Sequence, residues 1–234
     1  MTPDPSTRSS WWTKDRPTTL LSCWSATRGT HGIEVIRNDP PRGLSGARNT
    51  GIAATDAPFV TWIDDDDLTS PDRIARQLEA LRSGPWRWSC AARVDVDDDL
   101  QVIGHVRCPT PDGLLAQVLG RNVLPSAGQG LLVERSLLDE VGTFDESLDS
   151  AEDWDFAIRL AESGPGHMLD EPLVGYRTGF ASMSTDTDRM ERTIARCRGS
   201  LRRPVPPRGC GGRLGRDPSE PSGGRPAQLP TPCT

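Results

Sequence analysis

Phe59-Val60-Thr61-Trp62-Ile63-Asp64-Asp65-Asp66-Asp67 joins an apolar run directly to four consecutive aspartates. A short apolar run that ends in polar residues is typical of a buried strand. Ser70-Pro71-Asp72 follows, and each of these residue types favours the start of a helix as cap, first helical residue or dipole partner. Ile74, Leu78 and Leu81 then recur at helical spacing. The stretch therefore predicts a strand, an acidic loop at its carboxyl end, and an amphipathic helix.

The same alternation continues on both sides of this stretch. Strands are predicted at 33–37, 87–94, 100–106, 130–133 and 168–177, and helices at 44–55, 112–120, 135–140 and 151–162. Strands that alternate with helices are typical of an α/β fold with a mostly parallel sheet and flanking helices. Ligands of such sheets bind beyond the carboxyl ends of the strands, which is where the aspartates are predicted to lie.

Composition excludes several classes of protein. The chain has 234 residues and a net charge of −6, which argues against nonspecific binding to nucleic acid. It contains no apolar stretch long enough for a transmembrane segment. The six cysteines form neither a Cys-x-x-Cys pair nor a cluster with histidine, so we expect reduced thiols and a cytoplasmic location rather than a zinc site.

The chain divides into three parts by composition. Residues 1–30 are polar and irregular, residues 31–190 carry the strand and helix patterns, and residues 191–234 are rich in proline, glycine and arginine. A segment with so little apolar surface cannot offset its chain entropy by burial. We therefore expect one domain at 31–190 and a disordered tail after it.

The aspartate run is the first candidate site. Adjacent carboxylates repel one another, and a hard divalent cation would relieve that repulsion. Mg²⁺ and Mn²⁺ prefer oxygen ligands, and Mg²⁺ commonly uses one or two carboxylates together with substrate phosphates. The alternative is a solvated acidic loop without a ligand.

Glu152-Asp153-Trp154-Asp155 is the second candidate site. Ser150 and Asp153 have the spacing of a capping box, which places the acidic residues in the first turn of a helix. The helix dipole favours the ionised carboxylate there, and such a group could accept a proton from a substrate hydroxyl. The alternative is ordinary helix-start chemistry, with Asp155 and Arg159 paired one turn apart.

A third motif makes the pattern more specific. Gly43-Leu44-Ser45-Gly46-Ala47-Arg48-Asn49-Thr50-Gly51 precedes the strand, and glycines at a helix start let the backbone approach a phosphate. In this order and spacing, the three motifs closely resemble those of family 2 glycosyltransferases with the GT-A fold. The resemblance runs from about Gly32 to Ser184.

The resemblance implies a role for each matching residue. The aspartates from Asp64 to Asp66 look like the Asp-x-Asp motif, which binds the nucleotide sugar and a divalent metal, Mg²⁺ or Mn²⁺. Asp153 would be the catalytic base and Glu152 would orient the acceptor. No Gln-x-x-Arg-Trp motif follows, which favours addition of a single sugar. The implied site comprises Asp66 and Asp64 for the metal, Arg48, Asn49, Asp64 and Asp65 for the donor, and Asp153 and Glu152 for catalysis.

The beginning of the chain departs from this family. Neither an Ile-Pro-Thr-Tyr-Asn strand nor a Val-Asp-Asp-Gly-Ser strand is present, so the sheet is expected to be incomplete at its first strands. Trp11-Trp12-Thr13, read from the third base of each codon, gives Val-Asp where the family has its second strand. The hypothesis is that residues 1–30 are read out of frame; the alternative is a natural irregular extension.

Two functions follow from these observations. The first is inverting, metal-dependent, non-processive transfer of a sugar from a nucleotide-diphospho-sugar to an acceptor hydroxyl of unknown type. The second is an inactive remnant that keeps part of the fold without a complete donor site. A nucleotidyltransferase of similar fold would normally show a glycine-rich opening loop with arginine and lysine, and this chain has none.

Overall fold

The computed structural model describes residues 9–11, 33–148 and 150–178. The predictions for the tail and for most of residues 1–30 lie outside these ranges. The described elements, in chain order, are β1 (Ser9–Trp11), β2 (Ile33–Val35), α2 (Gly43–Ala53), β3 (Phe59–Thr61), β4 (Leu68–Thr69), α3 (Arg73–Arg82), β5 (Trp88–Val96), β6 (Val102–Val106), α4 (Leu114–Gly120), β7 (Leu131–Glu134), α5 (Arg135–Val141), α6 (Glu152–Ser163) and β8 (His167–Arg177).

Every strand and helix predicted between residues 33 and 178 is present, with ends that shift by a few residues. Helix α3 begins at Arg73, with Asp72 as its N-cap and no side-chain cap, so the predicted cap at Ser70 is wrong. The Ser70 hydroxyl instead accepts a hydrogen bond from the Asp72 N–H at 3.3 Å in the turn before the helix. Strands β1 and β4 were not predicted, since each is too short to show an apolar pattern.

The α/β class is confirmed, but the prediction of a mostly parallel sheet is wrong. The main sheet has the order β3-β7-β5-β8-β4, with β6 also pairing with β5. Only β5 and β8 pair in parallel, and the other four pairings of this sheet are antiparallel. Strands β1 and β2 pair in parallel in a separate two-stranded sheet. The described sheets are therefore mixed.

The physical reason lies in strand β7. Strands β3 and β5 run in the same direction and are joined through α3, as the alternating pattern predicts. Strand β7 enters between them later in the chain and runs antiparallel to both. A pattern of apolar residues indicates which segments are strands, but it does not indicate which neighbours a strand takes. The carboxyl ends of β3, β5 and β8 still share one edge of the sheet.

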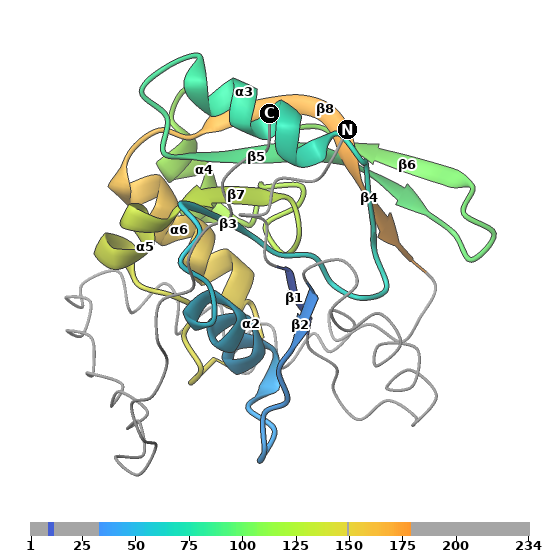
Figure 1. Ribbon diagram of the computed structural model, residues 1–234. Helices are drawn as coiled ribbons and strands as arrows, with labels where there is room; N and C mark the ends of the chain where they lie inside the picture. Colours follow the sequence, from blue (N-terminus) through green and yellow to red (C-terminus); the bar gives the residue numbers. More distant parts are fainter. Residues whose placement is uncertain (1–8, 12–32, 149, 179–234) are drawn as a thin grey trace, which may run out of the picture.

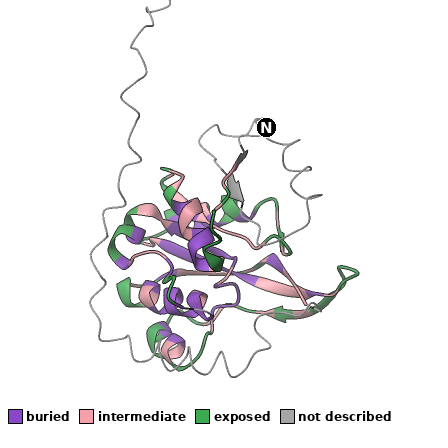
Figure 2. Cartoon of the chain, turned by 90° about the horizontal axis from the view of Figure 1, so that it is seen from below, coloured by how far each residue is buried: buried purple, intermediate pink, exposed green. Residues whose placement is uncertain are grey.

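Helices cover both faces of this sheet (Figure 1). Successive side chains of β5 point to opposite faces, as in any strand. Trp88 and Cys90 pack in the main apolar cluster with residues of α5 and α6. Ser89 points to the opposite face, where its hydroxyl accepts a hydrogen bond from Gln77 of α3 at 3.2 Å. Figure 2 shows the buried residues concentrated in the strands and on the helix sides that face them.

The face that α3 buries agrees with the predicted one at Leu81, which is buried, and at the half-buried Leu78, but differs at Ile74. Ile74 is 40% exposed, whereas Arg73 and Gln77 are almost fully buried. These polar side chains turn inward because they satisfy backbone carbonyls of the connection that precedes β7, and a buried polar group needs such a partner. Helix α3 thus donates hydrogen bonds to the backbone that leads into β7.

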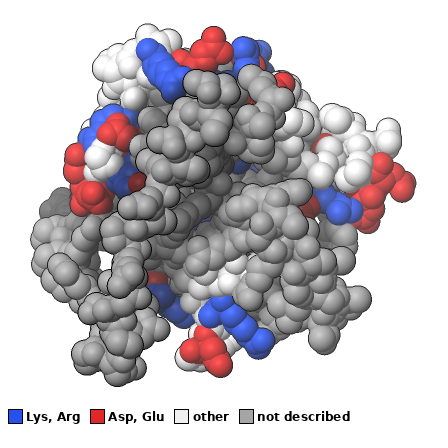
Figure 3. Space-filling model, viewed as in Figure 1, with Lys and Arg blue, Asp and Glu red and all other residues white. Residues whose placement is uncertain are grey.

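The described surface carries both signs of charge. On the face seen in Figure 3 the visible basic side chains lie beside acidic ones. The ion pairs between Arg87 and Glu140 at 2.8 Å and between Arg76 and Glu171 at 2.5 Å are examples. Exposed pairs of this kind contribute little to stability. None of the helices in the described ranges has the length and apolar character needed to span a bilayer.

Gly166→Ala is expected to destabilise the fold. A Cβ built on Gly166 would lie 2.4 Å from the ring of Trp88, whose indole is 1% exposed and cannot move aside. Such overpacking typically costs about 1–3 kcal/mol in the free energy of unfolding. Urea unfolding monitored by circular dichroism measures it.

Gly120→Ala is the matched control, because nothing lies within 4 Å of the corresponding Cβ. We expect its free energy of unfolding to change by less than about 0.5 kcal/mol. Equal stabilities of the two variants would contradict the packing of Gly166 against Trp88.

Candidate active site

The candidate site is organised around Arg48, in the middle of α2. Its side chain is only 6% exposed, and its guanidinium bridges two carboxylates that are far apart in the sequence. Nη2 donates to Asp64 Oδ1 and Nη1 donates to Glu152 Oε1, each at 2.9 Å. The guanidinium also lies over the Phe144 ring, 5.1 Å from its centroid. The glycine-rich motif and both acidic motifs therefore meet at one residue.

The electrostatics of this pair of ion pairs explain how a buried arginine is tolerated. Burial lowers the pKa of Arg48, but the charges of Asp64 and Glu152 outweigh that effect and raise the pKa above its ordinary value. The guanidinium thus stays charged. Removing one partner of a buried ion pair leaves an uncompensated charge, which typically costs about 3–5 kcal/mol.

The four consecutive aspartates separate into different environments. Asp64 faces Arg48, whereas Asp65 and Asp66 are exposed. Asp67 turns toward the sheet, where its carboxylate accepts hydrogen bonds from the Gln129 side chain and, at 3.0 Å, from the Arg177 backbone N–H. Burial raises the pKa of Asp67 to about 6, although these hydrogen bonds act in the opposite direction. The bond to Arg177 joins the end of the aspartate loop, directly before β4, to the carboxyl end of β8.

The residues fit a divalent cation through their donor chemistry. Asp66 presents an exposed carboxylate on the loop that also carries Asp64. In the described part of the chain, no three acidic, histidine or cysteine side chains gather as a complete metal cage. Mg²⁺ commonly takes only one or two protein carboxylates and completes its shell with water and substrate phosphates. A hard cation shared with a diphosphate therefore matches these oxygen donors.

Helix α6 begins differently from the prediction. Ala151 is the N-cap in a left-handed conformation (φ 55°), and no side chain caps the helix, so the capping box at Ser150 is wrong. Instead, Oδ1 of Asp153 accepts a hydrogen bond from the Trp154 N–H at 2.8 Å. The left-handed residue turns the chain directly into the first turn, where Glu152 is buried against Arg48.

Asp153 has a raised affinity for protons. Burial is the main cause, the adjacent Glu152 and the more distant Asp64 add to it, and Arg48 and the Trp154 N–H oppose it. Together they raise the pKa of Asp153 to about 6. A carboxylate tuned toward neutral pH is better matched to general-base catalysis than one with an ordinary pKa.

Asp155 takes the ordinary role that the sequence left open for it. Its Oδ2 accepts hydrogen bonds from Arg159 Nε at 2.9 Å and Nη2 at 2.7 Å. Arg159 also donates to the Val141 carbonyl at 2.7 Å, which ties α6 to α5. Asp155 is therefore committed to packing between helices.

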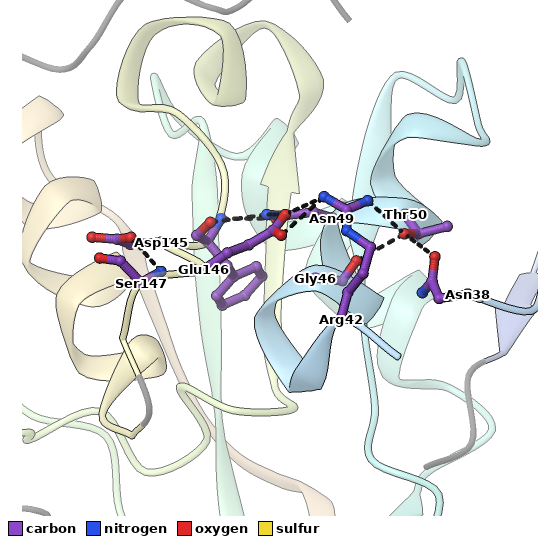
Figure 4. A network of polar contacts seen from close by, with 9 residues as sticks. Asn38, Arg42, Gly46, Asn49, Thr50, Asp145, Glu146 and Ser147 are labelled. Atoms are coloured by element: carbon purple, nitrogen blue, oxygen red, sulfur yellow. Dashed lines mark hydrogen bonds and ion pairs between the residues drawn. The ribbon is translucent and has the colours of Figure 1, made fainter. Parts of the chain in front are cut away.

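Asn49 makes its hydrogen bonds in a separate network, seen in Figure 4. Its amide nitrogen donates to the Phe144 carbonyl and to Glu146, each at 2.9 Å, and its oxygen accepts from the Phe144 N–H at 3.0 Å. Arg42 binds the same Glu146 carboxylate at 2.6 and 2.9 Å. Asn49 thus holds the loop that presents Phe144 to Arg48, and its role in donor binding stays a prediction.

The connection 121–130, between α4 and β7, makes several contacts at the site that the sequence does not predict. Three consecutive carbonyls of this connection accept hydrogen bonds from buried side chains: Gly128 from Arg48 at 3.2 Å, Gln129 from Arg73 at 3.0 Å and Gly130 from Gln77 at 2.8 Å. Burial lowers the pKa of Arg73 to about 10.

Asn122 of the same connection donates to Asp153 Oδ2 at 3.2 Å. No sequence signal marks any of these contacts, since each depends on the path of an irregular backbone.

Comparison with protein-family models matches residues 13–142 to the family described as "Glycosyl transferase family 2". The match covers more than half of the chain, and it includes Arg48 and the aspartate run. The match begins at residue 13, inside the segment 1–30 that differs in composition from the rest of the chain. The division of the chain into three parts therefore stays a prediction. Glu152 and Asp153 lie beyond the matched residues, so their roles rest on geometry.

Known proteins are similar over the same region. An uncharacterized glycosyltransferase of Haemophilus influenzae is 25% identical over 173 residues, which cover 69% of this chain and 57% of that protein. The pre-mycofactocin glycosyltransferase of Mycobacterium tuberculosis is 29% identical over 164 residues, which cover 62% of this chain and 32% of that protein. The chain thus spans 57% or less of the length of these relatives.

Solved structures show the fold. The crystal structure of S. aureus TarS residues 1–349 in complex with UDP-GlcNAc superposes with a TM-score of 0.59 at 16% identity, covering 76% of this chain and 54% of that one. With the family match over 13–142, these findings lead to one assignment: the chain belongs to glycosyl transferase family 2 and has the GT-A fold.

Proposed function

We propose that the protein is an inverting, metal-dependent, non-processive glycosyltransferase, which moves one sugar from a nucleotide-diphospho-sugar to an acceptor hydroxyl. The observation that carries the proposal is the double ion pair of Arg48, which brings the aspartate loop after β3 beside the start of α6. Glycosyl transfer needs a stabilised leaving group and a base for the acceptor, and these tasks require different carboxylates. The site offers one acidic motif for each.

Asp153 is proposed as the base. An acceptor hydroxyl held at its carboxylate would lose a proton to it as the new glycosidic bond forms at the anomeric carbon. As the acceptor oxygen bonds to the anomeric carbon, the bond from that carbon to the nucleoside diphosphate breaks on the opposite side, and this in-line displacement gives inversion. Glu152 is held by Arg48 and would orient the acceptor rather than take its proton.

The donor is proposed to bind at the aspartate loop. Mg²⁺ or Mn²⁺ held by Asp66, with Asp64, would neutralise charge that develops on the diphosphate. Asp65 and Arg48 would contact the nucleotide. TarS is described in complex with UDP-GlcNAc, which supports a uridine-diphosphate sugar as the first donor to test.

One observation favours the alternative of an inactive remnant. Within the described residues, the first strand of the main sheet in chain order is β3, because β1 and β2 form a sheet of their own. The family resemblance assigns the nucleotide base to the opening strands of the main sheet. Donor binding therefore decides between an enzyme and a remnant.

Hydrolysis of nucleotide sugars separates the two functions. The full chain is incubated with UDP-glucose, UDP-N-acetylglucosamine and GDP-mannose, with and without Mn²⁺, and release of the nucleoside diphosphate is followed by mass spectrometry. An active enzyme is expected to release the nucleoside diphosphate from at least one of these donors, and only when Mn²⁺ is present. A remnant releases none.

Asp153→Asn is expected to lower turnover by at least about a hundredfold, because the amide cannot take a proton. Donor affinity and the thermal unfolding midpoint are expected to stay near the parental values, since the amide keeps the size of the carboxylate and an oxygen that can accept from the Trp154 N–H, while the Asn122 amide can turn to accept from the new NH2 group. Initial rates and donor titrations measure the two effects. Near-parental turnover would place the base elsewhere.

The pH dependence follows from the same carboxylate. Asp153 must be ionised to accept a proton, and its pKa is raised to about 6. Turnover is therefore expected to rise with pH through about 6 and to level off above 7, falling about tenfold for each pH unit below the pKa. Measurement of kcat between pH 5 and 8 tests this. A limb centred near pH 4 would show an unperturbed carboxylate.

Asp66→Ala is expected to abolish the Mn²⁺-dependent part of UDP binding, because it removes the exposed carboxylate proposed to share the cation with the diphosphate. Isothermal titration calorimetry of UDP with and without Mn²⁺ measures this directly. Asp98→Ala is the control, since Asp98 is an exposed aspartate on the turn between β5 and β6. Equal Mn²⁺ dependence in both variants would argue against Asp66.

A further inference from the structure

We infer that Asn122 is a positioning residue for the reaction, which orients the Asp153 carboxylate toward the acceptor hydroxyl. The inference rests on the proposed function. Its basis is a hydrogen bond from Asn122 Nδ2 to Asp153 Oδ2 at 3.2 Å.

Both oxygens of the Asp153 carboxylate have a donor. Oδ1 accepts from the Trp154 N–H at 2.8 Å, and Oδ2 accepts from Asn122. One donor belongs to the first turn of α6, and the other comes from the connection after α4. Two donors from different elements fix the plane of the carboxylate, which a single backbone contact leaves free to rotate. The orientation of a base limits the rate at which it can take a proton.

The backbone at Asn122 is held on both sides. Helix α4 ends at Gly120, where the Arg121 N–H still donates to the Gln117 carbonyl at 3.1 Å. The Trp154 indole N–H donates to the Val118 carbonyl at 2.6 Å, which ties the end of α4 to the start of α6. Beyond Asn122 the chain enters the core at Leu124, which is 5% exposed. Asn122 is therefore carried to Asp153 by anchored segments.

The chemistry of an amide suits this position. The charged groups that face Asp153 are Glu152 on α6, Arg48 on α2 and Asp64 after β3. Arg48 directs its hydrogen bonds to the other two carboxylates and to the Gly128 carbonyl, and none goes to Asp153. A second cation in place of Asn122 would weaken the base by stabilising its ionised form. A neutral amide donates a hydrogen bond without adding charge, so it fixes the orientation and preserves proton affinity.

Gly128 borders the same oxygen. A Cβ built on this glycine would lie 4.0 Å from Asp153 Oδ2 and 3.8 Å from Arg48 Nη2. A side chain at this position would begin in ordinary van der Waals contact with both atoms, so the connection passes close to the carboxylate on this side as well.

The test compares kcat and KM of full-length variants, using the fastest of the three nucleotide sugars named above, with Mn²⁺. Asn122→Ala removes the donor and is expected to lower kcat on the order of ten- to a hundredfold, with KM for the donor nearly unchanged. Asn122→Asp keeps the shape but places a carboxylate against Asp153, so its kcat is expected to fall further. Asn122→Gln keeps an amide and is expected to recover part of the loss. Arg121→Ala, an exposed neighbour, is the control.

The outcomes separate the inference from the proposed function. If Asp153→Asn is inactive while Asn122→Ala matches the parent, Asn122 has no positioning role and the inference alone fails. An equal loss in all three Asn122 variants would indicate a structural role and would also overturn it. If the parent hydrolyses none of the donors, or Asp153→Asn remains active, the proposed function fails and the inference falls with it.

Discussion

The structure of this site depends on one buried cation. Arg48 joins Asp64 to Glu152, and without it two acidic segments would lie close together in a setting where like charges repel. The guanidinium can do this because its two terminal nitrogens donate in different directions from one planar group. It thereby fixes the distance between the loop proposed to hold the donor and the helix proposed to carry the base. The helix that presents it is in turn held by Asn49 and Arg42 against the loop around Glu146.

The sequence predicts features that depend on residues close together in the chain, and it does not predict features that depend on contacts between distant segments. The strand at Phe59, the acidic loop and the helix after Ser70 follow from residue types that act within a few positions of one another. The position of β7 between β3 and β5 depends on tertiary pairing, and apolar periodicity carries no information about that choice. The same division holds at the site. The acidic motifs can be recognised from the sequence alone. The contact of Asn122 with Asp153 cannot, because it depends on the path of an irregular connection.

The four aspartates show how adjacency in sequence can mislead. A run of identical residues invites a single explanation, yet Asp64, Asp66 and Asp67 face a buried arginine, solvent and the end of β8, respectively. The chain avoids concentrated negative charge by dividing the run between these environments. The cost falls on Asp67, whose raised pKa means that burial opposes its ionisation.

The three consecutive carbonyls at 128–130 have a consequence for how such a site can evolve. Their donors are side chains of α2 and α3, so the shape of this connection is specified by residues that lie outside it. Backbone acceptors are common to every amino acid, so these three hydrogen bonds do not themselves select side chains at 128–130. The side chains of the connection are constrained separately, because Leu124 and Ala127 are buried in the core and Gln129 binds Asp67. Variation between relatives is then expected at the exposed start of the connection, around Arg121, while the buried residues from Leu124 to Ala127 and the helices that hold the path stay as they are.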